Sequence, residues 1–253
     1  MSSTQIQAWI GIVGGLAAAL LGVLQYFRYR TRRDKAAEVG QAFNTTIDGL
    51  NADGSPKQLA AAILLRRFFD KSTEQGSAGT PYGAEAVAVI AALLRGAEQS
   101  DLQKLLADGL GYAGSLRGAD LQACNLTNAY LGRRVRARND SNSRVPGTRR
   151  EKLDDSPVDI SSADLFRADL TGASLRSARG RGTVFYEAVL VRAVLEDADL
   201  SDADFRMATL TGARFTGAVL SGARFGGAID IPSDISARLD ANGVFVDFRK
   251  QAS

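Results

Sequence analysis

The sequence of 253 residues contains no histidine and a single cysteine, Cys124. Without histidine there is no Ser–His–Asp or Cys–His catalysis, no histidine metal ligand and no histidine pH switch. One cysteine cannot form an intramolecular disulfide. The net charge of +3 is too small to favour a nucleic-acid partner, and the phosphate-binding pattern GxxxxGK is missing. We therefore expect a protein that is not an enzyme and that binds no cofactor or metal.

Charged side chains are also missing from the first 27 residues, and residues 8–27 (AWIGIVGGLAAALLGVLQYF) are apolar apart from Gln25. A helix of this length spans ~30 Å, the thickness of a hydrocarbon core. A signal peptide carries its positive charge before the apolar segment, and a soluble helix would have a polar face. Here the basic residues come after it, and they are Arg28, Arg30, Arg32, Arg33 and Lys35.

Residues 1–35 are therefore predicted to be a transmembrane helix with a basic flank. The positive-inside rule places the N-terminus outside and the remaining chain in the cytoplasm, as a single-pass protein of a bacterial inner membrane. Small residues recur every four positions along this helix, which lets helices approach closely in lipid. We expect the lipid bilayer to be one partner and self-association through the helix to be another. The small-residue stripes consist of Gly11, Gly15 and Ala19 on one side and of Gly14, Ala18 and Gly22 on a neighbouring side.

Residues 36–111 have the pattern of a small helical module that joins the anchor to the rest of the chain. Three helix starts are visible: Ser55–Pro56, Thr80–Pro81 and Ser100, which with Gln103 forms a capping-box pattern. Apolar residues follow each start at helical spacing. A further helix is expected over 34–50. No group of residues in this module suggests site chemistry.

The most regular feature of the chain is a period of five residues between 112 and 230. Large apolar residues recur from Ile160 to Phe225, with Gly180 the exception, and a small residue stands two positions before almost every one. On a helix this period would spread around the axis, and on a strand it would alternate between faces. The apolar residues share one interior only if the chain turns a corner at every unit. The pattern therefore predicts a solenoid.

The repeats GADLQACNLTNAYL, SADLFRADLTGASL and DADLSDADFRMATLTGARF resemble the A(D/N)LXX units of the pentapeptide-repeat proteins. This resemblance implies a right-handed, quadrilateral β-helix with four units to each coil. Residues 20 apart would then stack, so Leu165, Phe185, Phe205 and Phe225 are expected to form an interior ladder. The fold class expected for the whole chain is α+β: a transmembrane helix, a helical module, this β-helix over 112–230 and a C-terminal cap over 231–253.

Two segments depart from the period. Residues 132–157 break it and shift the register, because 29 residues separate the centres Leu131 and Ile160; they carry eight basic and four acidic residues. We expect a projecting loop, which either contacts anionic lipid or nucleic acid or is only solvated. At Gly180 we expect a bulge, and Cys124 takes a small inward position where packing is expected. The arginines of interest in the loop are Arg133, Arg134, Arg136, Arg138, Arg149 and Arg150.

Three functions are compatible with these features. The first is a membrane-anchored, non-enzymatic scaffold whose β-helix binds an unidentified protein partner or itself. The second is an oligomerising effector that perturbs or permeabilises the inner membrane in a bacterial stress or anti-phage response. The third follows from the resemblance, because some family members mimic DNA and protect DNA gyrase, a topoisomerase. Residues 158–230 carry ten acidic and eight basic residues, whereas DNA mimicry needs a field of one sign. The scaffold is the function that the sequence favours.

Overall fold

The computed structural model describes residues 34–50, 56–70, 82–113, 115–132 and 158–246. The chain forms two compact units, Met1–Thr45 and Thr46–Ser253, and each is considered by itself. Residues 34–50 are helical, as the sequence predicts. The predicted transmembrane helix lies outside the described residues. Among the helices that are described, none combines the length and the apolar character needed to cross a membrane.

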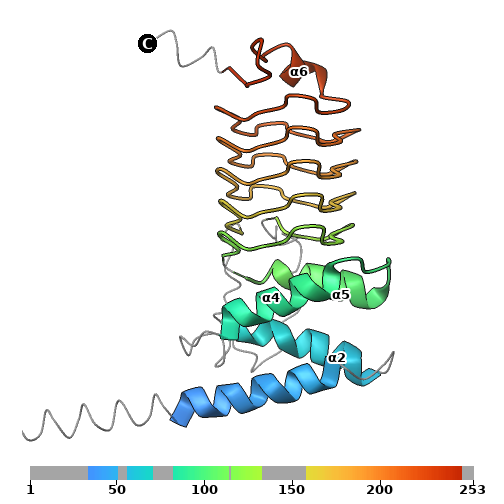
Figure 1. Cartoon of the computed structure of the whole chain (residues 1–253), viewed down its shortest axis with the longest axis vertical. Helices are drawn as coiled ribbons and strands as arrows, with labels where there is room; N and C mark the ends of the chain where they lie inside the picture. The colour runs from blue at the N-terminus through green and yellow to red at the C-terminus, as the bar shows by residue number, and fades with distance from the viewer. Residues whose placement is uncertain (1–33, 51–55, 71–81, 114, 133–157, 247–253) are drawn as a thin grey trace, which may run out of the picture. The chain divides into compact units, whose positions relative to one another are not determined.

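The second unit begins with short helices that share a small core (Figure 1). They are α2 (Pro56–Leu65), the 3-10 turn η1 (Arg66–Phe68), α4 (Tyr82–Leu94) and α5 (Asp101–Leu110). Both α2 and α4 pack against α5. Helix α5 begins where the sequence predicts, because the Ser100 Oγ accepts a hydrogen bond of 3.1 Å from the Gln103 backbone N–H. The core of these helices contains Leu65, Ile90, Leu94, Leu106 and Leu110, all fully buried.

The five-residue period produces square coils that stack on one another (Figure 1). Parallel β-bridges join residues 20 apart, as in Asp164↔Val184 and Val184↔Asp204. The bridges stay isolated and do not merge into longer strands, because a turn follows each of them. The large residue after each bridge points inward and is buried, as Leu165, Phe185 and Phe205 are. The repeats therefore form the β-helix that the period implies.

Each corner of a coil is a four-residue turn closed by a backbone hydrogen bond, such as Ala163 N–H to Ile160 O at 2.9 Å. The third turn residue has a positive φ in both glycine and non-glycine positions, for example 57° at Ser162 and 66° at Gly172, which identifies type II turns. Where an aspartate precedes the centre, it supports the corner from outside. Asp164 Oδ1, for instance, accepts a 3.0 Å hydrogen bond from the Phe166 N–H.

The coils remain in register across the interrupting segment 132–157. Asp120 pairs with Asp164 and Tyr130 with Ser174, an offset of 44 residues where later coils have 20. The 24 additional residues of the sequence fall between Tyr130, the last bridge position of the first coil, and Asp159, the first bridge position of the next. The register of the sequence therefore shifts, as predicted, because 44 is not a multiple of five, while the first run of repeats continues the same stack. Residues 133–157 lie outside the described residues.

No bulge occurs at Gly180. Its N–H donates to the Asp199 carbonyl at 2.7 Å, as its equivalents do in the other coils. A Cβ at Gly180 would lie 2.9 Å from Leu200 Cδ2 and 3.4 Å from Ile160 Cδ1, so the neighbouring coils already fill this position. Thr183 takes the place of the usual alanine and donates from Oγ1 to the Ile160 carbonyl at 2.8 Å. The expectation of a bulge was wrong because neighbours 20 residues away compensate for the missing side chain.

Both ends of the β-helix are covered by other parts of the second unit. At the first coil, the Asn125 N–H donates to the Leu94 carbonyl at 2.8 Å. The buried Gln103 side chain donates to the Asn125 carbonyl at 2.9 Å and so does not complete the expected capping box. At the last coil, α6 (Ser233–Ser236) is followed by an antiparallel bridge between Arg224 and Val244. Backbone groups that an open solenoid would expose are thereby paired.

Candidate interaction surface

Most residues that the sequence singles out lie outside the described residues. These are the two small-residue stripes between 11 and 22, the four arginines of the basic flank between 28 and 33, and six of the seven arginines between 133 and 150. Lys35 is described, and its side chain is exposed on the helix over 34–50. The described residues that bear on function are therefore those of the β-helix and of the helices beside it.

The interior ladder lies on one side of the coils. The ring centroids of Phe185 and Phe205 are 4.8 Å apart with planes 4° apart, and those of Phe205 and Phe225 are 5.0 Å and 10° apart. Leu165 takes the equivalent position one coil earlier and is fully buried. Because these side chains face the core, they stabilise the solenoid and are not available to a partner.

The outer surface of the same side carries a second ladder, and we call this surface the aromatic face. Phe166 and Tyr186 follow two inward residues of the interior ladder and so point outward. Their rings stack with centroids 5.8 Å apart. Arg206 continues the stack, with its Cζ 5.4 Å from the centroid of Tyr186. The aromatic face consists of Phe166, Arg167, Tyr186, Glu187, Asp204, Arg206, Met207 and Arg224.

Asp204 fixes two arginines of the aromatic face. Arg206 donates from Nε and Nη2 to its two carboxylate oxygens at 2.8 and 2.7 Å, and Arg224 donates from Nη2 at 3.2 Å. Burial raises the pKa of Asp204, but the hydrogen bonds from Arg206 and the charges of both arginines outweigh burial and hold the pKa below its ordinary value. The same contacts raise the pKa of Arg206. Asp204 is therefore an ionised anchor that holds two guanidinium groups in fixed orientations.

A second ion pair completes the aromatic face. Arg167 Nε lies 2.6 Å from Glu187 Oε2, and the Arg167 Cζ lies 4.7 Å from the centroid of Phe166. Phe166 thus contacts both Arg167 and Tyr186, and Tyr186 contacts both Phe166 and Arg206. Both side chains keep partial exposure.

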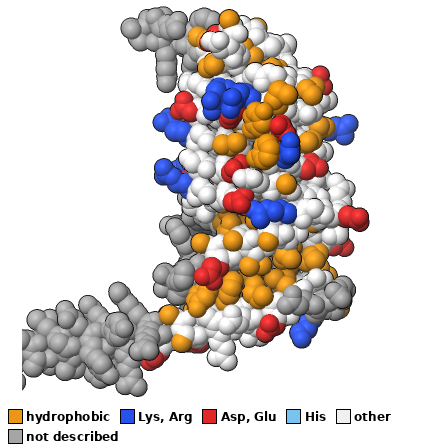
Figure 2. All heavy atoms as spheres, viewed as in Figure 1, with side chains coloured by type: hydrophobic (Ala, Val, Ile, Leu, Met, Phe, Trp, Pro, Cys, Tyr) orange, Lys and Arg blue, Asp and Glu red, His pale blue; other side chains and the backbone are white. Residues whose placement is uncertain are grey.

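The opposite side of the coils has a different chemistry. There Glu196 lies 3.1 Å from Arg176 and 3.2 Å from Arg214, so charges alternate and pair along the stack. Figure 2 likewise shows charged side chains of both signs interspersed over the coils on the visible face.

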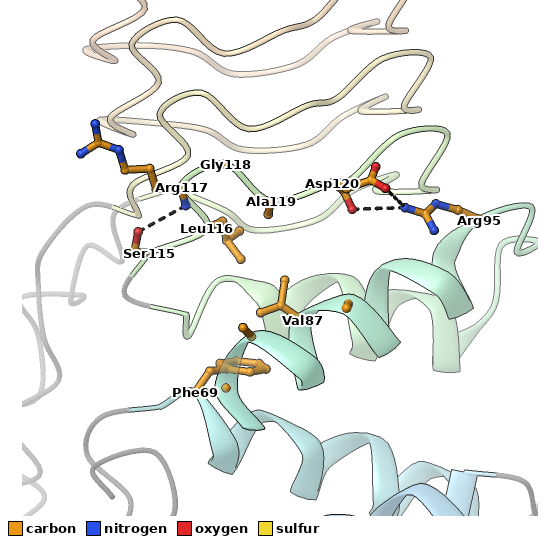
Figure 3. Close-up of a pocket in the computed structure, with 12 residues that line it drawn as sticks. Phe69, Val87, Arg95, Ser115, Leu116, Arg117, Gly118, Ala119 and Asp120 are labelled. Atoms are coloured by element: carbon orange, nitrogen blue, oxygen red, sulfur yellow. Dashed lines mark hydrogen bonds and ion pairs between the residues drawn. The ribbon is translucent and has the colours of Figure 1, made fainter. Parts of the chain in front are cut away.

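A groove of about 420 Å³ separates α4 from the first coil (Figure 3). Phe69 and Val87 line its helical side, and Leu116 lines its solenoid side. At one end, Arg95 Nη2 lies 2.7 Å from Asp120 Oδ2 and also donates to the Asp120 carbonyl at 3.3 Å. The Arg95 side chain therefore joins the end of α4 to the β-helix, in addition to the hydrogen bond between Asn125 and Leu94.

Cys124 is fully buried at its small inward position. Its Sγ lies 3.3 Å from the Ala91 carbonyl oxygen of α4. Burial is the main cause that raises the pKa of the thiol to about 11. The thiolate is the reactive form of cysteine, so burial keeps Cys124 in its less reactive, protonated form where it packs against α4.

Within the described residues, no group of three or more histidine, cysteine, aspartate or glutamate side chains is placed to hold a metal ion. The feature that sequence reasoning missed is the aromatic face. Its signal was present, because Phe166, Tyr186 and Arg206 stand 20 residues apart immediately after three inward centres. Reading the outward positions at the 20-residue period, as was done for the inward ones, would have found it.

The family model for pentapeptide repeats matches residues 163–202 and 198–229, with eight copies. Among solved structures, the chain is similar to the pentapeptide repeat protein Rfr23 of the cyanobacterium Cyanothece 51142, with 22% identity over 47% of this chain and 89% of that one and a TM-score of 0.24. A pentapeptide repeat protein from the thylakoid lumen of Arabidopsis thaliana has 22% identity over 53% of this chain and 83% of its own, with a TM-score of 0.24. No curated protein matches the chain.

HetL, a pentapeptide repeat protein involved in the regulation of heterocyst differentiation in Nostoc, is also similar, with 28% identity over 45% of this chain and 52% of its own and a TM-score of 0.20. The family match covers the coils between residues 163 and 229, and the first coil, over 115–131, lies outside it. These repeats account for the stacked coils and for both ladders. Residues 163–229 of the chain are therefore pentapeptide repeats.

Proposed function

We propose that this chain is a non-enzymatic, single-pass membrane-anchored scaffold that binds a protein partner through its aromatic face. The observation that carries this proposal is the outward stack of Phe166, Tyr186 and Arg206 on a rigid β-helix. Tyrosine, phenylalanine, methionine and arginine are the residues enriched in protein interfaces, and tyrosine and arginine are prominent among their hot spots. Pentapeptide-repeat proteins are, in general, non-enzymatic interaction proteins.

Rigidity strengthens this argument. Binding costs free energy when flexible side chains become ordered, about 0.5–1.5 kcal/mol for each. On the aromatic face the side chains are already ordered by stacking and by the bonds of Asp204 to Arg206 and Arg224. Met207, whose side chain is 51% exposed, stands beside them as an adaptable apolar contact.

The membrane part of the proposal comes from residues 1–35, whose apolar segment and basic flank have the length and order of an anchor. The anchor would hold the β-helix at the cytoplasmic surface of an inner membrane. Fractionation of cells tests this point directly: the full chain should remain with membranes after alkaline carbonate washing, and a chain lacking 1–35 should be in the soluble fraction. Equal distribution of the two would refute the anchor.

Site-specific photo-crosslinking in the organism's own cells tests the scaffold. A photoreactive amino acid replaces Met207 on the aromatic face or Arg214 on the opposite side, both of which are exposed. We expect one discrete heterologous product from position 207 and none from position 214. Equal products from both positions, or none from either, would contradict a partner site on the aromatic face.

The oligomerising membrane effector remains the second candidate, and the small-residue stripes of the anchor favour it. The backbone bonds that cover both ends of the β-helix disfavour end-to-end stacking, so clustering would have to come from the anchor. Gly11→Leu and Gly15→Leu should then lower both the oligomer size and the loss of membrane potential on expression. An unchanged oligomer and unchanged polarisation would exclude this function. The mixed charges of the coils do not supply the field that DNA mimicry requires.

A further inference from the structure

The cap pairs the backbone of only part of the last coil. The antiparallel bridge at Arg224 serves one side of that coil. The two sides before it, over 213–222, pair with no strand of the cap among the described residues, and we call them the open edge. Four backbone N–H groups of the open edge have no hydrogen-bond partner within the described residues, whereas their equivalents one coil earlier are bonded at 2.8 or 2.9 Å. The four belong to Phe215, Gly217, Leu220 and Gly222, and their bonded equivalents to Leu195, Asp197, Leu200 and Asp202.

A groove of about 470 Å³ lies between the open edge and the cap. Leu220 lines it from the coil, and Ile235 of α6 and Phe245 line it from the cap, which lies above the last coil in Figure 1. All three side chains are buried, while Val219 on the outside of the same edge is 47% exposed. An unpaired edge beside such a groove is a template for one further strand.

The open edge also carries a buried hydroxyl group that lacks a partner. Ser221 Oγ is enclosed and makes no hydrogen bond within the described residues. One coil earlier, Ser201 Oγ donates to Asp199 Oδ1 at 2.7 Å, but Val219 stands where that aspartate would be. A buried polar group without a partner is costly, so this position favours a segment that brings an acceptor.

The chain itself reaches the open edge at Val246. The Phe225 N–H donates to the Gly243 carbonyl and the Phe245 N–H to the Ala223 carbonyl, so this strand runs antiparallel to the coil. Each residue forward along it is therefore one residue back along the coil, toward the open edge. Residues 247–253, which lie outside the described residues, follow directly. Counted in the same register, they face residues 221–215 and so match most of the open edge.

The sequence of this segment fits that register. Residues directly opposite on paired strands point to the same face of the sheet, and Phe245, opposite the inward Ala223, is buried accordingly. In the same count, Phe248 stands opposite the inward Leu220, and Asp247 stands opposite Ser221. The register thus brings a phenylalanine to the groove and a carboxylate to the unpartnered hydroxyl group.

We propose that residues 247–253 dock as an antiparallel strand on the open edge, with Phe248 in the groove and Asp247 accepting a hydrogen bond from Ser221 Oγ. The docked strand completes the cover of the last coil and closes its edge to other strands. Charge does not oppose this contact, because both surfaces carry both signs. The groove contributes Asp234 and Arg238, and the segment contributes Asp247, Arg249 and Lys250. The inference does not depend on the aromatic face or on the anchor.

Engineered cysteines test the register in the full chain in mild detergent. Val219 and Arg249 face each other in it, and residues directly opposite have Cα atoms about 4.5–5.5 Å apart, which suits a disulfide. Val219→Cys with Arg249→Cys should form an intramolecular disulfide on mild oxidation, detected by mass spectrometry after proteolysis without reduction. Ile229→Cys with Arg249→Cys is the matched control and should form none, because Ile229 is a similarly exposed outward position on another side of the coil. The buried Cys124 stays out of the reaction.

Amide hydrogen exchange tests the pairing of the edge. The Leu220 amide should exchange about tenfold more slowly in the full chain than in Phe248→Ser, because the variant loses the side chain that holds the strand in the groove. Gln251→Ser, at an outward position of the same segment, should change this rate by less than about twofold. The Phe225 amide, which bonds to the Gly243 carbonyl, should keep its rate in both variants and so report an intact cap.

Three results would overturn the proposal. Equal disulfide yields from the two cysteine pairs, or none from Val219 with Arg249, would show that the segment does not follow the open edge. A disulfide between two chains would assign the edge to a second copy. Equally fast exchange of the Leu220 amide in the full chain and in Phe248→Ser would show that water satisfies the edge. None of these results bears on the scaffold function, which the cross-link at position 207 tests.

Discussion

Phe205 is the residue whose removal tests the interior ladder most directly. It is fully buried and stacks on Phe185 at 4.8 Å and on Phe225 at 5.0 Å, and Phe215 approaches it edge-on at 5.6 Å. Phe205→Ala removes the ring from three aromatic contacts in a core that is bounded by rigid turns and so collapses poorly. Large-to-small changes of this kind cost about 3–5 kcal/mol, and three lost aromatic contacts place this one near the upper limit.

Phe205→Leu is the matched control. Leucine fills the equivalent position of an earlier coil at Leu165, so the coil accepts its shape, and we expect a cost of about 1.5 kcal/mol. The assay is chemical denaturation of the full chain in mild detergent, followed by circular dichroism. Because coils contact only their neighbours, the alanine variant should also broaden the transition as the stack divides at its weakened coil. A cost for Phe205→Ala no larger than that of Met207→Ala, on the outside of the same coil, would refute the ladder as a source of stability.

Three further predictions follow from single positions. The pKa of Asp204 is lower in the folded protein than in the unfolded chain, so its contribution to stability is present above about pH 3.9 and is lost as the pH falls through the folded value. In Asp204→Asn, the free energy of unfolding should therefore fall less steeply as the pH is lowered through this range. Met207 and Gly217 both have a positive φ, of 60° and 74°, which is strained for any residue but glycine, and a Cβ at Gly217 would also contact Asp197 Oδ1. In the same denaturation assay, Met207→Gly should therefore stabilise the full chain by about 1 kcal/mol, and Gly217→Ala should destabilise it by at least as much. Cys124 should react with iodoacetamide at pH 8 only when the protein is unfolded, as mass spectrometry would show, because burial keeps its thiol protonated.

The sequence was sufficient to predict the coils because every five-residue unit repeats the same local geometry. Once a turn follows each pair of inward residues, the positions of Leu165, Phe185 and Phe205 are determined by counting. The start of α5 was also predictable, because the Ser100 side chain bonds within its own first turn. Interactions between neighbours in the sequence are what a pattern can report.

Features that depend on distant residues were missed. Gln103 looked like half of a capping box, but its side chain bonds to Asn125, 22 residues away. Gly180 looked like a defect, but Leu200 and Ile160 of the neighbouring coils fill its place. In both cases the residue's role is set by a coil or helix that is adjacent only in space.

The turns also determine which outward positions of the repeats are needed for the fold and which are available for function. Asp164, Asp169 and Asp199 each accept a hydrogen bond from a backbone N–H two residues later, at 3.0, 2.9 and 3.2 Å. An aspartate at this position is therefore accounted for by the corner that it supports, and its charge says little about a partner. The side chain of the residue after each centre takes no part in this hydrogen bond. Because that position can vary without disturbing the corner, as from Phe166 to Tyr186, the proposed partner site is placed on the aromatic face.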